Sequence, residues 1–229
     1  MAQAATDVRA MFDRIAGRYD AANRVMSVGF DVLWRRRAMR RLLDELGPRP
    51  WVLDLGAGTL DGAVEILRQR PDAHVVAADF TRAMLVAGRR KPGAKAVALH
   101  AADGQRLPYR EGAFVAAFSG FCVRNLRDLA VGLSELRRVI RPGGRLLILE
   151  FFRPERPRPF WDGLFTGRLL PLLGWAIGGD REAYRYLPES IQRFDTRADF
   201  EAKLRVAGFA DVRGQDLFPG GIASLVEAR

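Results

Sequence analysis

Asp54, Gly56 and Gly58 are the part of this sequence best suited to chemistry. An apolar run leads through Asp54 to Gly56 and Gly58, and a helical pattern follows. Because glycines have no side chain, a ligand can approach such a loop closely. In an open parallel sheet the loop lies at the carboxyl ends of the strands, where ligands bind. Asp54 at such a position suits an ammonium or another cationic group better than a phosphate.

Two further aspartates stand at the ends of later predicted strands, and they are expected at the same edge of the sheet as Asp54. Asp79 ends the second strand, 21 residues after Gly58, and a carboxylate at that place can accept the hydroxyl protons of a ribose. Asp103 follows the third strand. Together with Asp54 these residues predict a site for a ligand that carries a ribose and a positive charge. The alternative is structural: the glycines form a tight turn and the aspartates cap helices.

Two common nucleotide sites do not fit this loop. The dinucleotide fingerprint needs a small third residue at position 61, where the chain has Asp61 beside the expected pyrophosphate. A phosphate-binding P-loop needs a Gly-Lys pair followed by Ser or Thr, and no such triplet follows the glycines. The loop therefore argues against NAD and against a P-loop.

Alternating strands and helices must position these residues. Apolar runs predict strands at residues 51–55, 74–79, 95–101, 113–119 and 145–151. Helical patterns predict helices at residues 60–70, 81–90 and 126–140. Thr81 can cap the second of these helices, and the turn Pro142-Gly143-Gly144 stops the third. Repeated strand–helix units predict an α/β fold, an open parallel sheet with helices on both faces.

The chain reads as one domain, because no linker interrupts it and its 229 residues, 48% of them apolar, can bury a sizeable core. Its parts are a helical cap (1–46), a cofactor-binding core (47–151), an apolar lid insertion (152–194), and a final helix and hairpin (195–229). The last part carries a helix near residues 197–207 and two strands, at about 210–217 and 221–228.

Longer sequence blocks connect the glycine loop to a known family. The loop, the aspartates at the strand ends and the closing hairpin resemble the S-adenosylmethionine-dependent methyltransferases of the Rossmann-like class. The block at residues 11–20, the pair Arg124-Asn125 and the block at 184–191 narrow this to a resemblance to the ubiquinone/menaquinone biosynthesis C-methyltransferases. Other matching positions are Asn23, Met26, Ser27, Gly29, Trp34, Val123, residues 140–145 and Leu149-Glu150-Phe151.

The resemblance implies a fold, a cofactor and an activity. The fold is a seven-stranded, mostly parallel sheet with an antiparallel C-terminal hairpin. The cofactor is S-adenosylmethionine, and no metal is needed. The positions implied for its site are Asp54, Gly56, Gly58, Thr59, Asp79, Phe80, Asp103, Gly104 and Gly120. The implied activity is methyl transfer to a ring carbon of a polyprenylated quinol, either demethylmenaquinol or the ubiquinone precursor.

Three positions depart from the family pattern. Leu60 stands where the family usually has a third glycine, and it either crowds the methionine end of the cofactor or shifts the loop. Gly120 stands where a serine is usual, and Gly104 follows Asp103 where an alanine is usual. These departures keep open a second interpretation, a methyltransferase for another phenolic or apolar acceptor.

A quinol ring needs help from the protein, because a neutral aromatic carbon is a poor nucleophile until the adjacent hydroxyl loses its proton. The two histidines, His74 and His100, lie in or beside predicted strands and are interpreted as structural. The resemblance points instead to Tyr19, Arg124 and Asn125. In this hypothesis Arg124 stabilises the quinolate, directly or through a water, and Asn125 orients a hydroxyl. Tyr19 closes over the cofactor and the ring.

The alternative for the same three residues is structural. Asn125 would cap a helix that starts at Leu126, and Arg124 would bind an acid. Tyr19 would be a packed aromatic residue of the N-terminal helical region.

The chain is strongly basic, with 37 Lys and Arg against 27 Asp and Glu and a formal net charge of +10. Such a balance favours polyanionic partners. A nucleic-acid-binding or RNA-modifying protein is therefore the alternative from a different class. Lysine is scarce, however, and no lysine-rich tail or aromatic–basic binding motif is present. We predict a polyprenyl quinol and no nucleic acid as the partner.

The apolar stretch at residues 164–177 is either an ordinary core helix or a lid over the prenyl tail that also contacts an anionic membrane. The arginines at 37, 40 and 41 are either a solvated helix face or part of that contact. No secretory signal and no spanning apolar run is present, and Cys122 is the single cysteine. We therefore expect a cytoplasmic protein, with peripheral membrane contact and homodimer formation both open.

Overall fold

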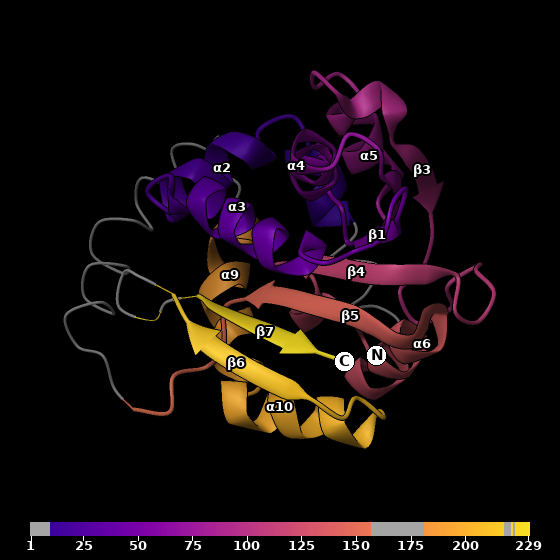
Figure 1. Cartoon of the computed structure of the whole chain (residues 1–229). Helices are drawn as coiled ribbons and strands as arrows, with labels where there is room; N and C mark the ends of the chain where they lie inside the picture. The colour runs from indigo at the N-terminus through magenta and orange to yellow at the C-terminus, as the bar shows by residue number, and fades with distance from the viewer. Residues whose placement is uncertain (1–9, 157–180, 218–220, 222) are drawn as a thin grey trace.

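The computed structural model of the chain describes residues 10–156, 181–217, 221 and 223–229. Its centre is a seven-stranded sheet in the order β3-β2-β1-β4-β5-β7-β6 (Figure 1). Strands β1 to β5 pair in parallel, whereas β7 pairs antiparallel with β5 and with β6. The predicted mostly parallel sheet with an antiparallel C-terminal hairpin is confirmed. The strands are β1 (Trp51–Leu55), β2 (His74–Asp79), β3 (Ala98–Ala101), β4 (Phe114–Gly120), β5 (Ile140–Glu150), β6 (Val212–Asp216) and β7 (Ser224–Ala228).

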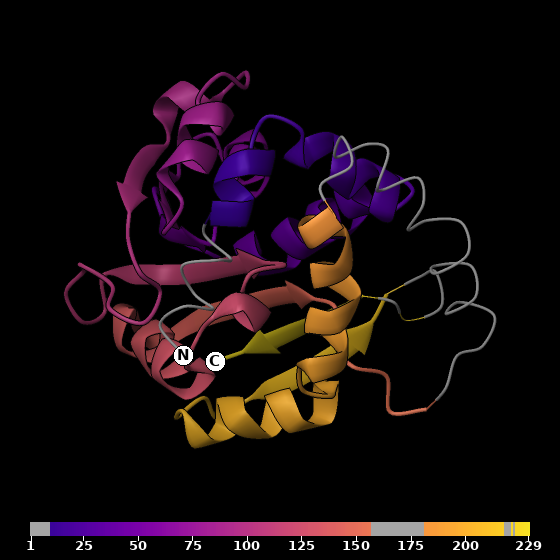
Figure 2. The ribbon, with the colours of Figure 1, turned by 180° about the vertical axis from the view of Figure 1, so that it is seen from behind.

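Helices cover both faces of the sheet (Figures 1 and 2). One buried apolar cluster joins Leu42, Ile66 and Leu85 to one face, and a second joins Leu136 and Leu204 to the other. Helices α3, α4 and α5 therefore pack on the first face, and α6 and α10 on the second. The α-helices are α2 (Tyr19–Met26), α3 (Phe30–Leu43), α4 (Asp61–Gln69), α5 (Arg82–Gly88), α6 (Leu129–Val139), α9 (Arg181–Arg193) and α10 (Arg197–Val206).

The central strands are apolar on both sides, which is why the sequence shows them as unbroken apolar runs. In β1, Val52 belongs to the first apolar cluster and its neighbour Leu53 to the second. Successive side chains of a strand point to opposite faces, and a parallel sheet covered by helices is buried on both. Strand ends therefore become the places where polar side chains can occur.

The main difference from the predicted elements lies between β4 and β5. The helix expected from residue 126 begins at Leu129, because Asp128 is its N-cap and accepts a hydrogen bond from the Val131 N–H at 3.1 Å. The preceding residues Val123–Asn125 form a 3-10 turn, η2. The expectation that Asn125 caps this helix is therefore wrong.

Two smaller differences concern the third strand and the start of helix α5. The strand expected at 95–101 begins only at Ala98, because Gly93, with a φ of +84°, starts the 3-10 turn η1 (Ala94–Ala96). Thr81 stands at the N-cap position of α5, but its side chain makes no capping hydrogen bond.

The predicted helical cap at residues 1–46 consists of separate helices where it is described. Gly29, with a φ of +79°, separates α2 from α3. Helix α3 packs against α4, β4 and β5, and so it covers the first face of the sheet. Of the predicted lid insertion, the structure describes residues 152–156 and helix α9. The apolar stretch at 164–177 lies outside the described residues.

Candidate active site

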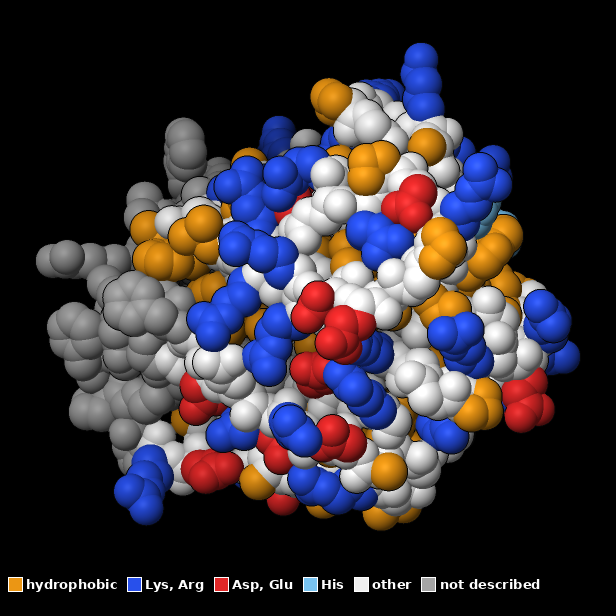
Figure 3. Space-filling view, viewed as in Figure 1, with side chains coloured by type: hydrophobic (Ala, Val, Ile, Leu, Met, Phe, Trp, Pro, Cys, Tyr) orange, Lys and Arg blue, Asp and Glu red, His pale blue; other side chains and the backbone are white. Residues whose placement is uncertain are grey.

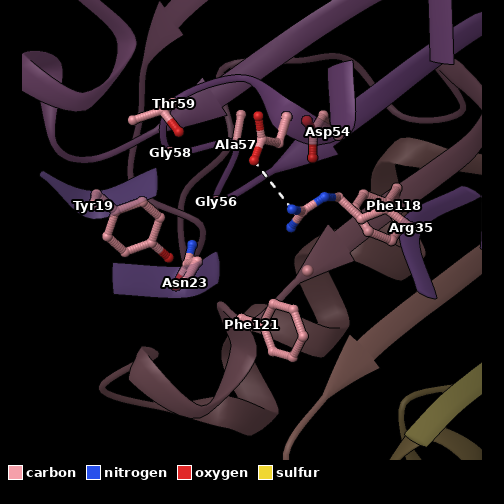
Figure 4. A pocket seen from close by; sticks show the side chains of 13 residues that line it. Tyr19, Asn23, Arg35, Asp54, Gly56, Ala57, Gly58, Thr59, Phe118 and Phe121 are labelled. Carbon is pink, nitrogen blue, oxygen red and sulfur yellow. Dashed lines mark hydrogen bonds and ion pairs between the residues drawn. The ribbon is translucent and has the colours of Figure 1, made fainter. Parts of the chain in front are cut away.

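A cleft lies beside the carboxyl ends of β1 and β4. Figure 4 shows Tyr19 and Asn23 of α2 on one side of it, and Arg35 of α3 with Asp54 of β1 on the other. The cleft is therefore closed by the helical cap and floored by the sheet. It is lined by Tyr19, Asn23, Arg35, Asp54, Gly56, Ala57, Gly58, Thr59, Asp61, Gly62, Phe118, Gly120 and Phe121.

The loop after β1 requires glycine at position 56. Gly56 has a φ of +68°, and a Cβ added there would overlap the Sγ of Cys122. The Gly56 N–H donates to the carbonyl oxygen of Ala78 at 2.8 Å, and the Gly58 N–H donates to Asp79 Oδ2 at 2.8 Å. These bonds join the loop to the end of β2, so the predicted glycine turn forms one wall of the cleft.

Asp54 is a buried carboxylate with an unused acceptor. Among the residues that the structure describes, none donates a hydrogen bond to its Oδ2 atom. Burial raises the pKa of this carboxyl to about 7, although a hydrogen bond from the Ala63 N–H acts in the opposite direction. A Cβ on Gly62 would lie 2.7 Å from Oδ2, so glycine there leaves space beside the carboxylate. A cation in the cleft would stabilise the ionised form of Asp54.

Asp79 joins the glycine loop to the start of α5. Its Oδ1 accepts a hydrogen bond from the Thr81 N–H at 2.7 Å, and its Oδ2 accepts the one from Gly58. Burial raises the pKa of Asp79, while these two backbone bonds lower it. These bonds fix the loop but do not cap α5, whose N-cap residue is Thr81, so the capping role considered for Asp79 in the alternative is not present. A carboxylate oxygen can accept more than one bond, so the ribose contact stays a prediction.

Four predicted cofactor positions, Asp79, Phe80, Asp103 and Gly104, are not among the residues that line the cleft. Phe80 is half-buried and Gly104 is buried, whereas Asp103 is exposed and accepts a hydrogen bond from the Gln105 N–H at 2.9 Å. Asp54, Gly56, Gly58, Thr59 and Gly120 line the cleft together with Tyr19. The cofactor roles of Phe80, Asp103 and Gly104 stay predictions.

Arg124 is buried next to this cleft and contacts several partners. Its Nη1 lies 2.5 Å from Glu150 Oε1 and donates to the carbonyl oxygen of Phe121 at 3.1 Å. Its Nε donates to Ser190 Oγ at 3.2 Å, and its guanidinium lies 5.9 Å from the centre of the Phe151 ring. The acid that the structural alternative expected for Arg124 is therefore Glu150.

The Arg124–Glu150 pair is an ion pair in the interior. The side chain of Arg124 is 6% exposed and that of Glu150 is 0% exposed. Burial opposes the charge of Arg124, but Glu150 raises the pKa of the guanidinium above its ordinary value. Burial likewise raises the pKa of Glu150, and Arg124 counteracts it. A catalytic role for Arg124 stays a prediction, and it has to be compatible with this pairing.

Asn125 and three aromatic rings connect Arg124 to the cleft. The Tyr186 hydroxyl donates to Asn125 Oδ1 at 2.6 Å. The Phe12 ring stands edge-on to Tyr19 and to Tyr186, with centroid distances of 6.0 and 6.4 Å. Burial raises the pKa of both tyrosines, while the charge of Arg124 lowers it. Tyr19 is thus both packed against an aromatic residue and exposed to the cleft.

The histidines lie at the edges of strands. The His74 ring stacks on Trp51 with a centroid distance of 4.7 Å, and His100 Nδ1 lies 2.9 Å from the Tyr109 hydroxyl. Neither is among the residues that line the cleft. Within the described residues, no group of three or more His, Cys, Asp or Glu side chains could hold a metal ion.

Comparison with known proteins decides the family. The family model described as the ubiE/COQ5 methyltransferase family matches residues 1–228. The chain belongs to this family. The demethylmenaquinone methyltransferase of Thermus thermophilus is 41% identical to it over 220 residues, which cover 94% of this chain and 97% of that protein. The ubiquinone/menaquinone biosynthesis C-methyltransferase UbiE of Syntrophotalea carbinolica is 40% identical over 224 residues, 96% of this chain and 92% of that protein.

Solved structures share the fold of this ubiE/COQ5 family member. A chain of the complex between the Haloferax volcanii Trm112 methyltransferase activator and a putative methyltransferase superposes with a TM-score of 0.67 at 16% identity, covering 95% of this chain and 96% of that one. Haemonchus contortus phosphoethanolamine N-methyltransferase 2, solved with S-adenosyl-L-methionine, gives a TM-score of 0.61 at 17% identity, covering 81% and 39%. These likenesses show the fold alone.

The family membership makes this protein an S-adenosylmethionine-dependent methyltransferase. Its cleft fits that cofactor on an independent observation. The unused oxygen of Asp54 is an acceptor for a positively charged group, and Gly56, Gly58 and Gly62 leave room for a ligand beside it.

Leu60, the departure from the family's third glycine, does not crowd the cleft. Its backbone has a φ of +70°, in the region that favours glycine. Its side chain is completely buried in the first apolar cluster and is not among the lining residues. A Cβ on Gly88 would lie 2.6 Å from the Leu60 Cγ, so the leucine fills space beside α5.

Sequence reasoning missed Arg35, Asn23 and Asp61 as lining residues. Arg35 belongs to the run Trp34–Arg37, which looks like a solvated face because it contains three consecutive arginines. The helical period carried the missing signal. Asp31 and Arg35 are four residues apart and continue the buried stripe of Met39, so these two charged residues stand on an apolar face.

Proposed function

We propose that this methyltransferase methylates a ring carbon of a polyprenylated quinol, with demethylmenaquinol as its preferred acceptor. The observation that carries the proposal is the similarity to the Thermus thermophilus demethylmenaquinone methyltransferase, 41% identical over nearly the full length of both proteins. The UbiE relatives, named for both ubiquinone and menaquinone biosynthesis, support the same reaction class. The ubiquinone precursor is therefore the second acceptor to test.

The cofactor half of the site is the glycine-lined wall of the cleft. S-adenosylmethionine, when bound, supplies an electrophilic methyl group on a positively charged sulfur. Asp54 binds a positive group of that molecule, and Gly56, Gly58 and Gly120 let it approach the strand ends. Asp79, which fixes the loop at Gly58, is the acceptor for ribose hydroxyls. By excluding water and fixing orientation, these residues align the methyl donor with its acceptor.

The acceptor half of the site is the group of side chains between Tyr19 and Arg124. Asn125 Oδ1 is already used by the Tyr186 hydroxyl, so the Asn125 amide N–H bonds remain to orient a hydroxyl of the ring. Tyr19 closes over the cleft from α2. These residues place the ring so that one carbon faces the methyl donor.

Arg124 stabilises the quinolate oxygen that forms when the ring hydroxyl loses its proton. Glu150, Ser190 and the Phe121 carbonyl hold the guanidinium in one orientation. A donor fixed in advance stabilises developing negative charge without reorganising. Since Glu150 neutralises part of the charge, Arg124 acts on the quinolate through the two N–H bonds of Nη2, directly or through a water. Among the described residues, Nη2 has no hydrogen-bond partner.

A side-by-side assay tests the acceptor. Purified enzyme, S-adenosylmethionine with a labelled methyl group, and either demethylmenaquinol or the prenylated ubiquinone precursor are compared at matched detergent concentration. We expect methylation of demethylmenaquinol with the larger kcat/KM. Preference for the benzoquinol would overturn the ring assignment, and faster methylation of a phenol without a prenyl tail would favour the alternative acceptor class.

We also propose peripheral contact with an anionic membrane through the exposed side of α3. Among the described residues, no helix is long and apolar enough to cross a bilayer. Figure 3 shows basic side chains gathered over α3. Arg36, Arg37 and Arg40 are exposed there beside Leu33, which is 55% exposed. Arg41, by contrast, contacts Gln215 of the hairpin at 2.8 Å, so it is not part of this surface.

Vesicle binding tests the membrane contact with a matched control. Arg37→Gln/Arg40→Gln should reduce sedimentation with phosphatidylglycerol vesicles several-fold, because each basic residue near an anionic surface adds about 1 kcal/mol. Arg110→Gln/Arg127→Gln removes the same charge from exposed loop positions outside α3. Equal losses in both variants would assign the binding to net charge and contradict a defined surface.

A further inference from the structure

A buried arginine of the helical cap lines the cleft, and none of the roles assigned above uses it. Arg35 lies on α3, and its side chain is 10% exposed. The charged residues among the described residues that line the cleft are Arg35, Asp54 and Asp61, so Arg35 is the one cation of that described lining. In Figure 4 its guanidinium is directed at the glycine loop, near Asp54.

The contacts of Arg35 leave most of its donors unused. Its Nη2 contacts Asp31 Oδ2, and the same nitrogen donates to Asp61 Oδ2 at 3.1 Å. Both bonds use one nitrogen, so Nε and Nη1 have no hydrogen-bond partner among the described residues. A guanidinium presents five N–H donors in a fixed fork, whose geometry matches a carboxylate.

The two acids beside Arg35 also pair with other basic residues, so they neutralise the charge of Arg35 only in part. Asp31 also pairs with Arg24 at 3.0 Å and accepts a hydrogen bond from Ser27 Oγ at 2.8 Å. Asp61 also pairs with Lys91. Asp31 and Asp61 therefore orient the guanidinium while leaving it able to bind a further anion.

Arg35 and Asp54 carry opposite charges and line the same cleft. Among the residues that the structure describes, Asp54 Oδ2 has no donor and Arg35 Nε and Nη1 have no acceptors. The two side chains do not pair with each other. A ligand that satisfies both must carry an ammonium and a carboxylate at short separation. An α-amino acid group has this pattern, and S-adenosylmethionine ends in one.

We propose that Arg35 binds the α-carboxylate of S-adenosylmethionine while Asp54 binds its ammonium, so that the cap helix α3 supplies half of the recognition of the cofactor's amino acid end. The inference rests on the cofactor dependence of the family and is independent of which quinol is methylated. It gives Arg35 a role in cofactor specificity. The alternative is a purely structural role, in which the Arg35–Asp61 ion pair joins α3 to the start of α4.

The affinities of two ligands that differ only in the carboxylate distinguish carboxylate binding by Arg35 from a purely structural role. S-adenosylmethionine and its decarboxylated form share the adenosine, the sulfonium and the ammonium. We expect isothermal titration to show that the wild-type enzyme binds S-adenosylmethionine about 10- to 100-fold more tightly, as expected for a charge-assisted contact. Equal affinity of the wild-type enzyme for both ligands would overturn the proposal.

Substitution of Arg35 should remove this preference selectively. Arg35→Gln should weaken S-adenosylmethionine binding by the same factor and leave the affinity for the decarboxylated form within about threefold. Arg35→Lys keeps the charge but not the fork, and it should retain part of the preference. Arg24→Gln is the matched control: Arg24 shares Asp31 with Arg35 but is not among the lining residues, so the preference should be unchanged.

Outcomes of the substitutions are decisive in either direction. If Arg35→Gln weakens the binding of both ligands equally, the role of Arg35 is structural and the proposal fails. The melting temperature without ligand reports whether each variant folds. Should Arg35→Gln not fold, the ratio of the two affinities in Arg35→Lys replaces it, and a ratio equal to that of the wild-type enzyme would contradict carboxylate recognition by the fork. Methylation rates enter none of these measurements, so failure of the quinol assignment would not affect them.

Discussion

Arg35 and Arg124 are both buried arginines of the active site, and they are partnered in different ways. Arg35 uses one nitrogen for two carboxylates and leaves Nε and Nη1 without an acceptor among the described residues. Arg124 uses Nη1 and Nε for Glu150, Ser190 and a carbonyl oxygen. Arg35 therefore has three of its five N–H donors left for a ligand, whereas Arg124 has three of its five paired within the protein and only those of Nη2 left over.

This difference suits the two halves of the reaction. A cofactor that binds and leaves in every cycle gains affinity from groups that lack partners without it. A group that stabilises a short-lived charge is more effective when its position is already fixed. Substitutions of the Arg124–Glu150 pair should therefore change the stability of the free protein, and substitutions of Arg35 should change ligand affinity more than stability.

The largest effect is expected from removing one partner of the buried Arg124–Glu150 pair. Glu150→Ala leaves the guanidinium buried without its acid, which should lower the free energy of unfolding by about 3–5 kcal/mol in urea denaturation. Arg124→Met/Glu150→Gln removes both charges and should cost far less stability while abolishing methylation. Wild-type turnover in this double variant would remove Arg124 from the mechanism.

A smaller loss is expected from Gly56→Ala in the cleft. The added Cβ meets a backbone with φ +68° and overlaps Cys122, so we expect a loss of about 2–4 kcal/mol. Gly143→Ala is the control, since Gly143 has φ +72° but no atom within 4 Å of the added Cβ; it should cost about 1–2 kcal/mol. Titration calorimetry should show weaker cofactor binding for Gly56→Ala alone.

Asp54→Asn should act in the opposite direction on the cofactor-free protein. The carboxyl has a pKa of about 7 when folded and 3.8 as the reference. The folded state thus binds this proton more tightly, and stability falls as pH rises from 4 through 7. The asparagine removes this slope and should stabilise the free protein by about 1–3 kcal/mol at pH 8.

Cofactor affinity provides the second readout for Asp54. In the wild-type protein it should rise as pH increases through 7, because the ionised carboxylate attracts the ammonium. In Asp54→Asn it should be lower by about 10- to 100-fold at pH 8 and lack this pH dependence. Unchanged affinity at pH 8 would mean that the unused oxygen does not face the ligand.

The smallest effect is expected from Tyr186→Phe, which removes the hydrogen bond to Asn125. The loss of stability should be about 0.5–1.5 kcal/mol. Tyr109→Phe, which removes a comparable hydroxyl from His100 outside the cleft, should cost about as much. Steady-state kinetics should show a lower kcat for Tyr186→Phe only. A similar kcat in both variants would limit Tyr186 to a structural role.

Much of the fold was predictable because burial on both faces gives a parallel strand a distinctive apolar run, as in β1 and β2. The glycine loop was predictable because its backbone demands residues without side chains. The start of α6 was not, since Asn125 and Asp128 are both good capping residues. Asp128 is the cap in the structure, and Asn125 instead bonds to Tyr186, a residue 61 positions away.

The candidate site was predictable only in part, for reasons of distance along the chain. Asp54, Gly56 and Gly58 are local to one loop, whereas the Arg124–Glu150 pair spans 26 residues and no sequence pattern fixes its partner. Arg35 was not recognised as a site residue because it belongs to a run of three arginines that resembles a solvent-exposed helix face. The four-residue spacing of Asp31, Arg35 and Met39 indicates which arginine of the run points inward, and the packing of α3 against α4 agrees with it.

Lys91 connects two parts of the site that are far apart in sequence. Its Nζ lies 2.8 Å from Asp20 Oδ2 on α2 and also contacts Asp61 at the start of α4. Asp20 precedes Asn23 and follows Tyr19, which line the cleft. The side chains of Lys91, Asp20 and Asp61 are 22–42% exposed to solvent. Dissolved salt therefore weakens the ion pairs between them. The residence time of the cofactor should consequently shorten as ionic strength rises, and the speed of cofactor exchange becomes a property of the surrounding electrolyte.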